Sequence, residues 1–274
     1  MRNKILNTLK NKGFVGFFVT CINFVLHRLF KVEIVGKNII SKNPIARKIF
    51  SRCNLQYSDE GYFFLNPMPS KKELDEYYSS VYWNSRAKIN SLVSTRDLIH
   101  FNILKKLFDK DKVFVNIGSA YGNISHLFFL MGMKIINIEP SPIPNFYDDN
   151  ENWRTVTDIS EVKDCSADIV YGSHSLEHVQ DIEFFKKQIG KVLKPKGHVF
   201  WEVPNADCED NGPLLNKIII PHTYYFQTKF FKKWFKNTIL LDEFEHTSHT
   251  FDIQNWQKNQ KKGGIVIRAL GTLD

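Results

Sequence analysis

Two glycines and one acidic residue have the spacing of a nucleoside-binding site. Gly118 and Gly122 lie in a tight turn after the apolar run 113–117, and Glu139 follows a second apolar run, 134–138. Glycine permits backbone angles and close approaches that a Cβ would forbid, and the N–H groups that open the next helix face whatever lies on the turn. An acidic side chain about 20 residues further on can accept both hydroxyls of a ribose. The combination favours a nucleoside site over the alternative in which the glycines serve turn geometry alone.

Histidines in two later parts of the chain are candidates for proton transfer. His174 and His178 come directly after the apolar run 168–172, and His222 opens an aromatic block. Histidine is suited to take the proton of a hydroxyl near neutral pH, so His222 is the candidate general base, with Tyr225 helping to orient it. His178 is a second candidate at the reaction centre. The competing interpretations are that His178 shapes its loop and that His222 packs beneath the aromatic block.

Metal ligands are not evident in the sequence. Glu245, His246 and His249 have suitable side chains, but three polar residues in one loop are more often solvated. The four cysteines stand far apart without paired spacing, which favours neither a zinc site nor a disulfide framework and fits a reducing cytosol: Cys21, Cys53, Cys165 and Cys208. We therefore predict no metal site.

The segments that must position these residues alternate between strands and helices. Seven strands are expected, at residues 113–117, 134–138, 154–156, 168–172, 198–203, 238–243 and 264–270. Apolar positions every three or four residues predict helices between them, the clearest being 182–192. This alternation predicts an α/β fold with a doubly wound, mostly parallel seven-stranded sheet. Ligands bind such sheets at the carboxyl ends of the strands, where the glycine turn, Glu139 and the loop that begins at Ser173 would meet.

The N-terminal part divides into two segments. Residues 1–50 are basic, apolar and helix-prone, and we expect a helical appendage; residues 51–110 hold a short strand at 62–65, a capping box that opens at Ser70 and a helix at 96–108. Residues 111–274 would form the nucleoside-binding domain.

Charge and hydropathy limit the partners. The chain has 274 residues and a formal net charge of +8, which favours an anionic partner such as a nucleotide sugar, a polyanionic glycan, nucleic acid or an acidic membrane face. Residues 14–30 are apolar and aromatic with basic flanks, but too short and too polar to span a bilayer. They suit peripheral contact with a membrane, while packing on the main domain or on a partner subunit is the alternative. The expected location is the cytoplasm, with peripheral association at the inner face of the membrane as the further option, and no oligomeric state is implied.

Several of these motifs resemble those of class I S-adenosylmethionine-dependent methyltransferases, most closely the branch that acts on sugars and small metabolites. Residues 116–122 match the family's opening turn, acidic-x-Gly-x-Gly-x-Gly, and residues 173–179, 193–197 and 202–205 resemble its later signature. The resemblance covers about residues 50–270. It implies a Rossmann-like methyltransferase fold and S-adenosylmethionine as the cofactor.

The resemblance also implies the cofactor-binding residues. They are Asn116, Gly118, Ser119, Ala120, Gly122, Glu139, Asp158 and Ser173. Glu139 corresponds to the ribose-binding acid, and Asp158 to the residue that reaches the adenine amine. Asn116 and Ala120 depart from the pattern, because the family usually has a carboxylate and a glycine there. Near Cys53 the chain is similar to an N-terminal zinc-binding module of some relatives, but only one of its four ligands is present.

The function implied is methyl transfer to a small-molecule or glycan acceptor, in particular O-methylation of a sugar in surface-polysaccharide biosynthesis. Asn116 and Ala120 support an alternative, a cofactor-binding or inactive homologue that is a partner protein in a glycan-assembly complex. Basic residues do not interleave with aromatic ones in one segment, and the Asp/Asn-Pro-Pro-Tyr/Phe motif of amino-methylating nucleic-acid enzymes is absent. Both observations argue against a nucleic-acid acceptor.

Overall fold

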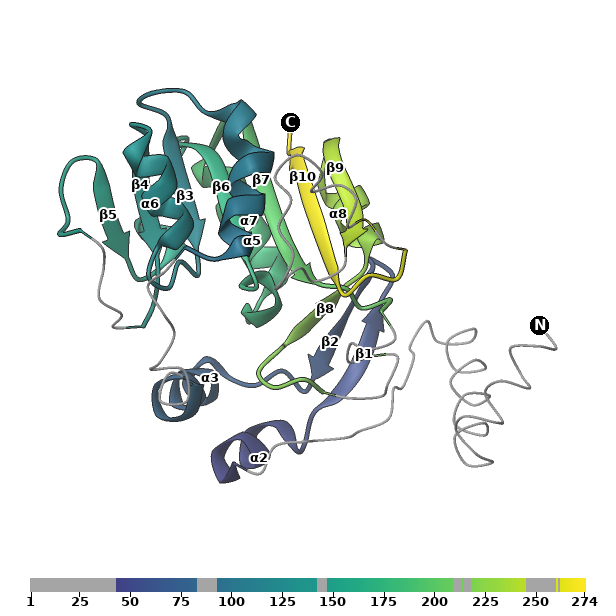
Figure 1. Cartoon of the computed structure of the whole chain (residues 1–274). Helices are drawn as coiled ribbons and strands as arrows, with labels where there is room; N and C mark the ends of the chain where they lie inside the picture. Colours follow the sequence, from purple (N-terminus) through teal and green to yellow (C-terminus); the bar gives the residue numbers. More distant parts are fainter. Residues whose placement is uncertain are drawn as a thin grey trace.

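A seven-stranded sheet forms the centre of the protein (Figure 1). The computed structural model describes residues 43–82, 93–141, 147–208, 213, 218–244, 260 and 262–274. The strand order is β5-β4-β3-β6-β7-β10-β9. The strands are β3 (Val113–Ile117), β4 (Lys134–Ile138), β5 (Trp153–Val156), β6 (Ala167–Ser173), β7 (Leu193–Pro204), β9 (Asn237–Phe244) and β10 (Val266–Thr272). The predicted α/β fold is confirmed.

Pairing in this sheet is parallel from β5 to β7 and antiparallel on both sides of β10. The first five strands of the order are parallel because a helix or loop crossover returns the chain to the same end each time. β10 runs in the opposite direction, antiparallel to both of its neighbours, β7 and β9. The carboxyl ends of β3, β4 and β6 therefore meet at one edge, where the sequence predicts the ligand.

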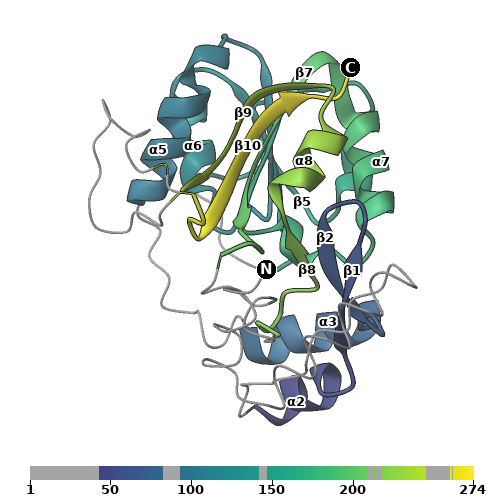
Figure 2. The same ribbon diagram turned by 90° about the vertical axis from the view of Figure 1, so that its right-hand side faces the viewer.

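Helices cover both faces of the sheet, as Figure 2 shows. On one face, α5 (Thr95–Leu104) and α6 (Asn123–Leu130) pack Ile103 and Phe128 against Phe114 and Tyr171. On the other, α7 (Ile182–Val192) and α8 (Thr228–Trp234) join a core that contains Val115, Val170 and Trp201. The strands are apolar on both sides because both sides are buried. The predicted helix 96–108 is shorter, ending at Leu104 before a 3₁₀ turn, Lys105–Leu107.

A second, three-stranded antiparallel sheet lies below the carboxyl ends of the parallel strands in Figure 1. It consists of β1 (Asn54–Ser58), β2 (Tyr62–Asn66) and β8 (Tyr224–Phe226), and it packs with α2 (Pro44–Phe50) and α3 (Lys71–Tyr77) around a separate apolar core. The capping box at Ser70 is confirmed at the start of α3. β1 was not predicted. β1 and β2 come from the expected 51–110 segment, whereas β8 comes from the expected nucleoside-binding domain, 111–274. The two segments are therefore joined in one sheet.

Some sequence-based expectations concern residues outside the described ranges. These are residues 14–30, the rest of the segment 1–42, and the loop with Glu245, His246 and His249. Across the described part of the chain, no helix is long and apolar enough to cross a membrane.

Candidate functional site

The turn after β3 is built on backbone angles that few residues adopt. Gly118 and Gly122 have φ of 67° and 71°, and Ala120 has φ of 48°. A Cβ on Gly118 would lie 2.7 Å from the Cβ of Ser175, so glycine is required there by both conformation and space. The N–H groups of residues 118 and 119 donate to the Ile138 carbonyl at 2.9 and 3.2 Å, which fastens the turn to β4.

A pocket of about 470 Å³ opens beside this turn. Its walls come from the β3 end and turn, the β6 end and the start of α5: Asn116, Gly118, Ser119, Ala120, Tyr121, Asn123, Ile124, Tyr171, Ser173, Val93, Ser94, Arg96 and Asp97. The structure thus brings together five of the predicted cofactor residues. The Oγ atom of Ser119 is buried and has no hydrogen-bond partner within the described ranges, as suits a wall that meets a polar ligand.

Three predicted cofactor residues do not line this pocket. Gly122 ends the turn. Glu139 is buried behind it, where its carboxylate accepts from the N–H groups of Ala120 at 2.9 Å and Ser141 at 3.0 Å. Burial raises the pKa of Glu139, and the two N–H donors oppose that effect. Asp158 is exposed and accepts from the Ser160 N–H at 2.9 Å, and this hydrogen bond lowers its pKa. Contact of Glu139 with ribose and of Asp158 with adenine stays a prediction.

Asn116 has a structural reason to be an amide. Its Nδ2 donates to Ser125 Oγ at 2.9 Å, and Ser125 Oγ donates in turn to Asn137 Oδ1 at 2.7 Å. A carboxylate at position 116 would compete for the single hydroxyl proton of Ser125. Among the described residues that line the pocket, Asp97 is the one carboxylate, and it was missed because residues 93–97 carry no motif except a capping box at Ser94.

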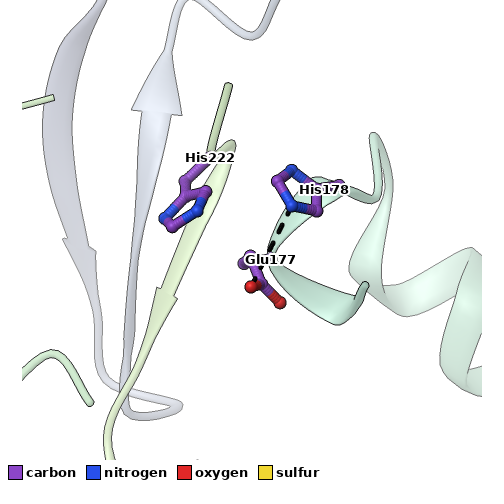
Figure 3. Close-up of side chains that lie close together, drawn as sticks. All are labelled: Glu177, His178 and His222. Atoms are coloured by element: carbon purple, nitrogen blue, oxygen red, sulfur yellow. Dashed lines mark ion pairs between the residues drawn. The ribbon is translucent and has the colours of Figure 1, made fainter. Parts of the chain in front are cut away.

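A second pocket of about 320 Å³ adjoins the first, and Arg96 lines both. It contains His178 and His222, which the sequence had singled out, together with Tyr82, His174, Glu177 and residues 219–221. Figure 3 shows the two imidazoles facing each other above Glu177. Their ring centroids are 5.0 Å apart. Ser173 lines the first pocket and the adjacent His174 the second, so the end of β6 connects the two.

Thr223 and Tyr225 hold His222 in this place. The Thr223 N–H donates to the Glu177 carbonyl at 2.8 Å, and its hydroxyl lies 2.6 Å from the Val179 carbonyl, to which it donates. Tyr225 is buried, and its hydroxyl accepts from the Ile219 N–H at 2.8 Å. Burial raises the pKa of Tyr225 above its ordinary value. Tyr225 does not line the pocket, but its ring centroid lies 5.9 Å from that of His222. It also supports His222 through Ile219, whose carbonyl accepts from the His222 N–H at 2.7 Å.

Buried carboxylates surround His174. Its Nδ1 lies 3.2 Å from Glu177 Oε1, and its Nε2 lies 3.5 Å from Glu202 Oε1. Burial alone would lower the pKa of His174, but the hydrogen bonds to the two carboxylates outweigh it and raise the pKa to about 9. Burial alone would raise the pKa of Glu177, yet His174 and the neighbouring histidines bring it down to about 2. The pair is therefore ionised at neutral pH.

Glu202 connects this group to the core. Its Oε2 accepts from His100 Nε2 at 2.9 Å and from Arg268 Nε at 2.7 Å, and Arg96 Nε lies 3.3 Å from Oε1. The sequence did not identify this network, because its members come from α5, β7 and β10 and share no local motif.

Comparisons with known proteins agree with this geometry. A family model described as a methyltransferase domain matches residues 86–261. The methyltransferase in a complex with the Haloferax volcanii Trm112 methyltransferase activator is 15% identical, with a TM-score of 0.51 over 73% of this chain and 96% of that one. Burkholderia thailandensis 1,6-didemethyltoxoflavin-N1-methyltransferase, solved with 1,6-didemethyltoxoflavin and S-adenosylhomocysteine, is 14% identical, with a TM-score of 0.51 over 80% of this chain and 95% of that one.

These two likenesses concern the fold alone. No curated protein matches the chain. The family match, however, spans well over half of the sequence and includes both pockets except Tyr82. The chain therefore belongs to the class I S-adenosylmethionine-dependent methyltransferases, and S-adenosylmethionine is its cofactor.

Proposed function

We propose that the protein transfers a methyl group to a hydroxyl of a small, sugar-like acceptor bound in the second pocket. The observation that carries the proposal is the junction of the two pockets at Arg96 and at the consecutive residues Ser173 and His174. The first pocket lies on the glycine turn, where this fold holds nucleosides. A volume of about 320 Å³ in the second is near the lower end of the usual range for small-molecule sites.

The chemistry requires alignment more than covalent assistance. When bound, S-adenosylmethionine supplies an electrophilic methyl group on a sulfonium. The bond that would form between the acceptor oxygen and the methyl carbon is balanced by the carbon–sulfur bond that would break, with its electron pair left on sulfur. Holding the two reactants in line can supply much of the rate increase. The hydroxyl proton must also leave, and Glu177, His178 and His222 are the groups of the second pocket that can promote its loss.

The role of His222 can take two forms. The sequence-based form makes it a general base, with a neutral imidazole that takes the hydroxyl proton and Tyr225 as the residue that positions it through Ile219. The other form, argued in the next subsection, uses the same imidazole as a metal ligand. Both place the acceptor hydroxyl in the second pocket, on the side that His222 lines.

Asp97 is proposed to replace the missing acid at position 116. The amino acid end of S-adenosylmethionine carries an ammonium group, and Asp97 is a carboxylate on the wall of the first pocket. Its Oδ2 accepts from the Ser94 N–H at 2.7 Å, which fixes the carboxylate at the start of α5. An opposite charge held in this way favours the ammonium group.

The proposed acceptor is a glycan or nucleotide-linked sugar of surface-polysaccharide biosynthesis. The net charge of +8 supports an anionic acceptor. The apolar, basic-flanked residues 14–30 support a cytoplasmic protein that touches the inner face of a membrane, where lipid-linked glycans are available. Flotation with anionic vesicles tests that contact. If the whole chain stays out of the vesicle fraction at low salt, residues 14–30 do not bind membrane.

A screen of nucleotide sugars and lipid-linked glycans with purified protein and methyl-labelled cofactor tests the function. We expect label in a product with an O-methyl group. Calorimetric titration with S-adenosylmethionine is the companion measurement, because the alternative of an inactive partner protein predicts no turnover on any acceptor of the screen.

A further inference from the structure

Glu177, His178 and His222 have the side-chain types and positions of a metal site (Figure 3). Each offers one ligand atom, and these atoms all lie within 4.8 Å of one another. The closest ion pair among them joins Glu177 Oε1 to His178 Nε2 at 4.0 Å. Two ligand atoms about 2.1 Å from a tetrahedral ion are about 3.4 Å apart. Modest side-chain rotations would therefore close the three residues around one cation.

The buried carboxylate of Glu177 also indicates a bound cation. Its side chain is 1% exposed, and its Oε1 atom lies 3.2 Å from His174 Nδ1, with which it forms an ion pair. The Oε2 atom is buried and has no hydrogen-bond partner in the described part of the chain. Burying a carboxylate oxygen without a partner is unfavourable. A buried carboxylate with one unpartnered oxygen, and with its other oxygen 4.0 Å from His178 Nε2, points to a cation as its partner.

Backbone contacts hold His222 close to Glu177 and His178, although it is distant from them in sequence. Glu177 and His178 lie in a 3₁₀ turn, Leu176–His178, at the carboxyl end of β6. Thr223, next to His222, donates its N–H to the Glu177 carbonyl at 2.8 Å. His174 orients the Glu177 carboxylate from outside the group, as hydrogen-bonded second partners of metal ligands do.

We propose that Glu177, His178 and His222 bind a divalent first-row transition cation, such as Mn²⁺ or Zn²⁺, on the wall of the second pocket. Imidazole nitrogens favour these ions, whereas Mg²⁺ prefers oxygen ligands. Three protein ligands leave coordination positions open, which is typical of catalytic sites. The sequence predicted no metal site because it gives no sign that residues 177–178 and 222 meet.

The cation would act on the acceptor. Its open positions adjoin the pocket that the three ligands line, so they are available to a hydroxyl oxygen, or to two neighbouring hydroxyls of a sugar. A coordinated hydroxyl loses its proton to water more easily, so His222 is not needed as a free base. This role toward the acceptor rests on the proposed function, whereas cation binding does not.

Cation binding can be measured without any acceptor. The full-length, untagged protein is stripped with a chelator and titrated calorimetrically with MnCl₂, ZnCl₂ and MgCl₂, and the visible absorption of added Co²⁺ gives a second readout. Glu177→Gln and His222→Asn are compared with wild type, and His198→Asn on β7 is the matched control because His198 lies outside both pockets. Melting curves identify any variant that fails to fold.

We expect one transition cation per chain, bound at least about tenfold more tightly than Mg²⁺. Loss of a residue that hydrogen-bonds to a metal ligand typically weakens metal binding roughly 10- to 100-fold, and His174→Gln should fall within that range. Each ligand variant should weaken cation binding by more than this. The control should bind as wild type does. Absence of a tight site in wild type, or unchanged binding in folded Glu177→Gln and His222→Asn, would overturn the proposal. Titration of the stripped protein with S-adenosylmethionine reports separately on the proposed function.

Discussion

Thr223 donates its backbone N–H to the Glu177 carbonyl, and its side-chain hydroxyl lies 3.0 Å from the same oxygen. This contact joins the start of β8 to the loop after β6, and Thr223 is fully buried. It is the reason that His222 lies opposite His178.

Thr223→Val should therefore destabilise the protein while keeping its shape. Valine has a similar volume but no hydroxyl, so the Val179 carbonyl loses its donor, at a cost of about 1–3 kcal/mol in the free energy of unfolding. Urea unfolding measures the change. Thr238→Val on β9 is the control because Thr238 is exposed, and it should cost little. Equal stability of the two variants would contradict the role given to Thr223.

Glu139→Gln should weaken binding of S-adenosylmethionine. Loss of charge-assisted hydrogen bonds to the ribose costs about 1.5–3 kcal/mol, which is about a 10- to 150-fold rise in the dissociation constant. The amide oxygen can still accept from the Ala120 N–H, so the turn keeps its support. Calorimetric titration checks the change against Glu151→Gln, an exposed control. Unchanged affinity would remove Glu139 from the ribose site.

The large sheet could be predicted from sequence because its evidence is local. Apolar runs such as 113–117 and 168–172 end in turns that the chain itself specifies, and each corresponds to an observed strand. The Glu202 network could not, because its members are distant in sequence, and β1 was missed because Leu55 is the one buried residue of its five. Leu55 pairs with Leu65 in a small sheet whose third strand is β8, and Glu202 binds side chains of α5 and β10. Only the folded chain brings such residues together.

Asp97→Asn should weaken cofactor binding selectively at the amino acid end. Asparagine keeps an oxygen for the Ser94 cap, so α5 should begin at the same place. Loss of the charge should raise the dissociation constant of S-adenosylmethionine about tenfold or more. 5′-Methylthioadenosine, which lacks the ammonium group, should bind wild type and variant equally. If both ligands weaken alike, Asp97 acts on the pocket's structure instead.

Acid should destabilise the fold through His100 and Glu202. His100 is fully buried, and burial lowers its pKa although Glu202 opposes the effect. The neutral ring donates from Nε2 to Glu202 and accepts from the Tyr171 hydroxyl at Nδ1, 2.8 Å away. The unfolded chain then binds more protons than the folded one below the ordinary value of 6.5, so stability falls as the pH falls through that value.

A second loss should begin below the ordinary value of 4.5 for Glu202, whose pKa His100 and Arg268 hold well down against the opposing effect of burial. Melting temperatures from pH 8 to pH 4 follow both steps. His100→Gln should reduce the dependence between 6.5 and 4.5, where the lowered pKa of His198 also contributes, and should shrink the lower step, which His174 and Arg268 still support. A wild-type melting temperature that stays level down to pH 5 would contradict the neutral state of His100.

His222→Ala should depress turnover once an acceptor is known. Loss of a general base slows a reaction about 10²- to 10⁴-fold, and loss of a metal ligand would also remove the group that activates the hydroxyl. His222 does not line the cofactor pocket, so the dissociation constant of S-adenosylmethionine and the melting temperature should stay near wild type. His198→Ala, at a half-buried histidine of β7, is the control and should retain turnover.

The two roles of His222 separate when the metal concentration is raised, because excess Mn²⁺ can partly refill a site that has lost one ligand but cannot replace a free base. Near-normal turnover in His222→Ala would exclude both roles and leave the alignment of acceptor and cofactor as the main source of catalysis.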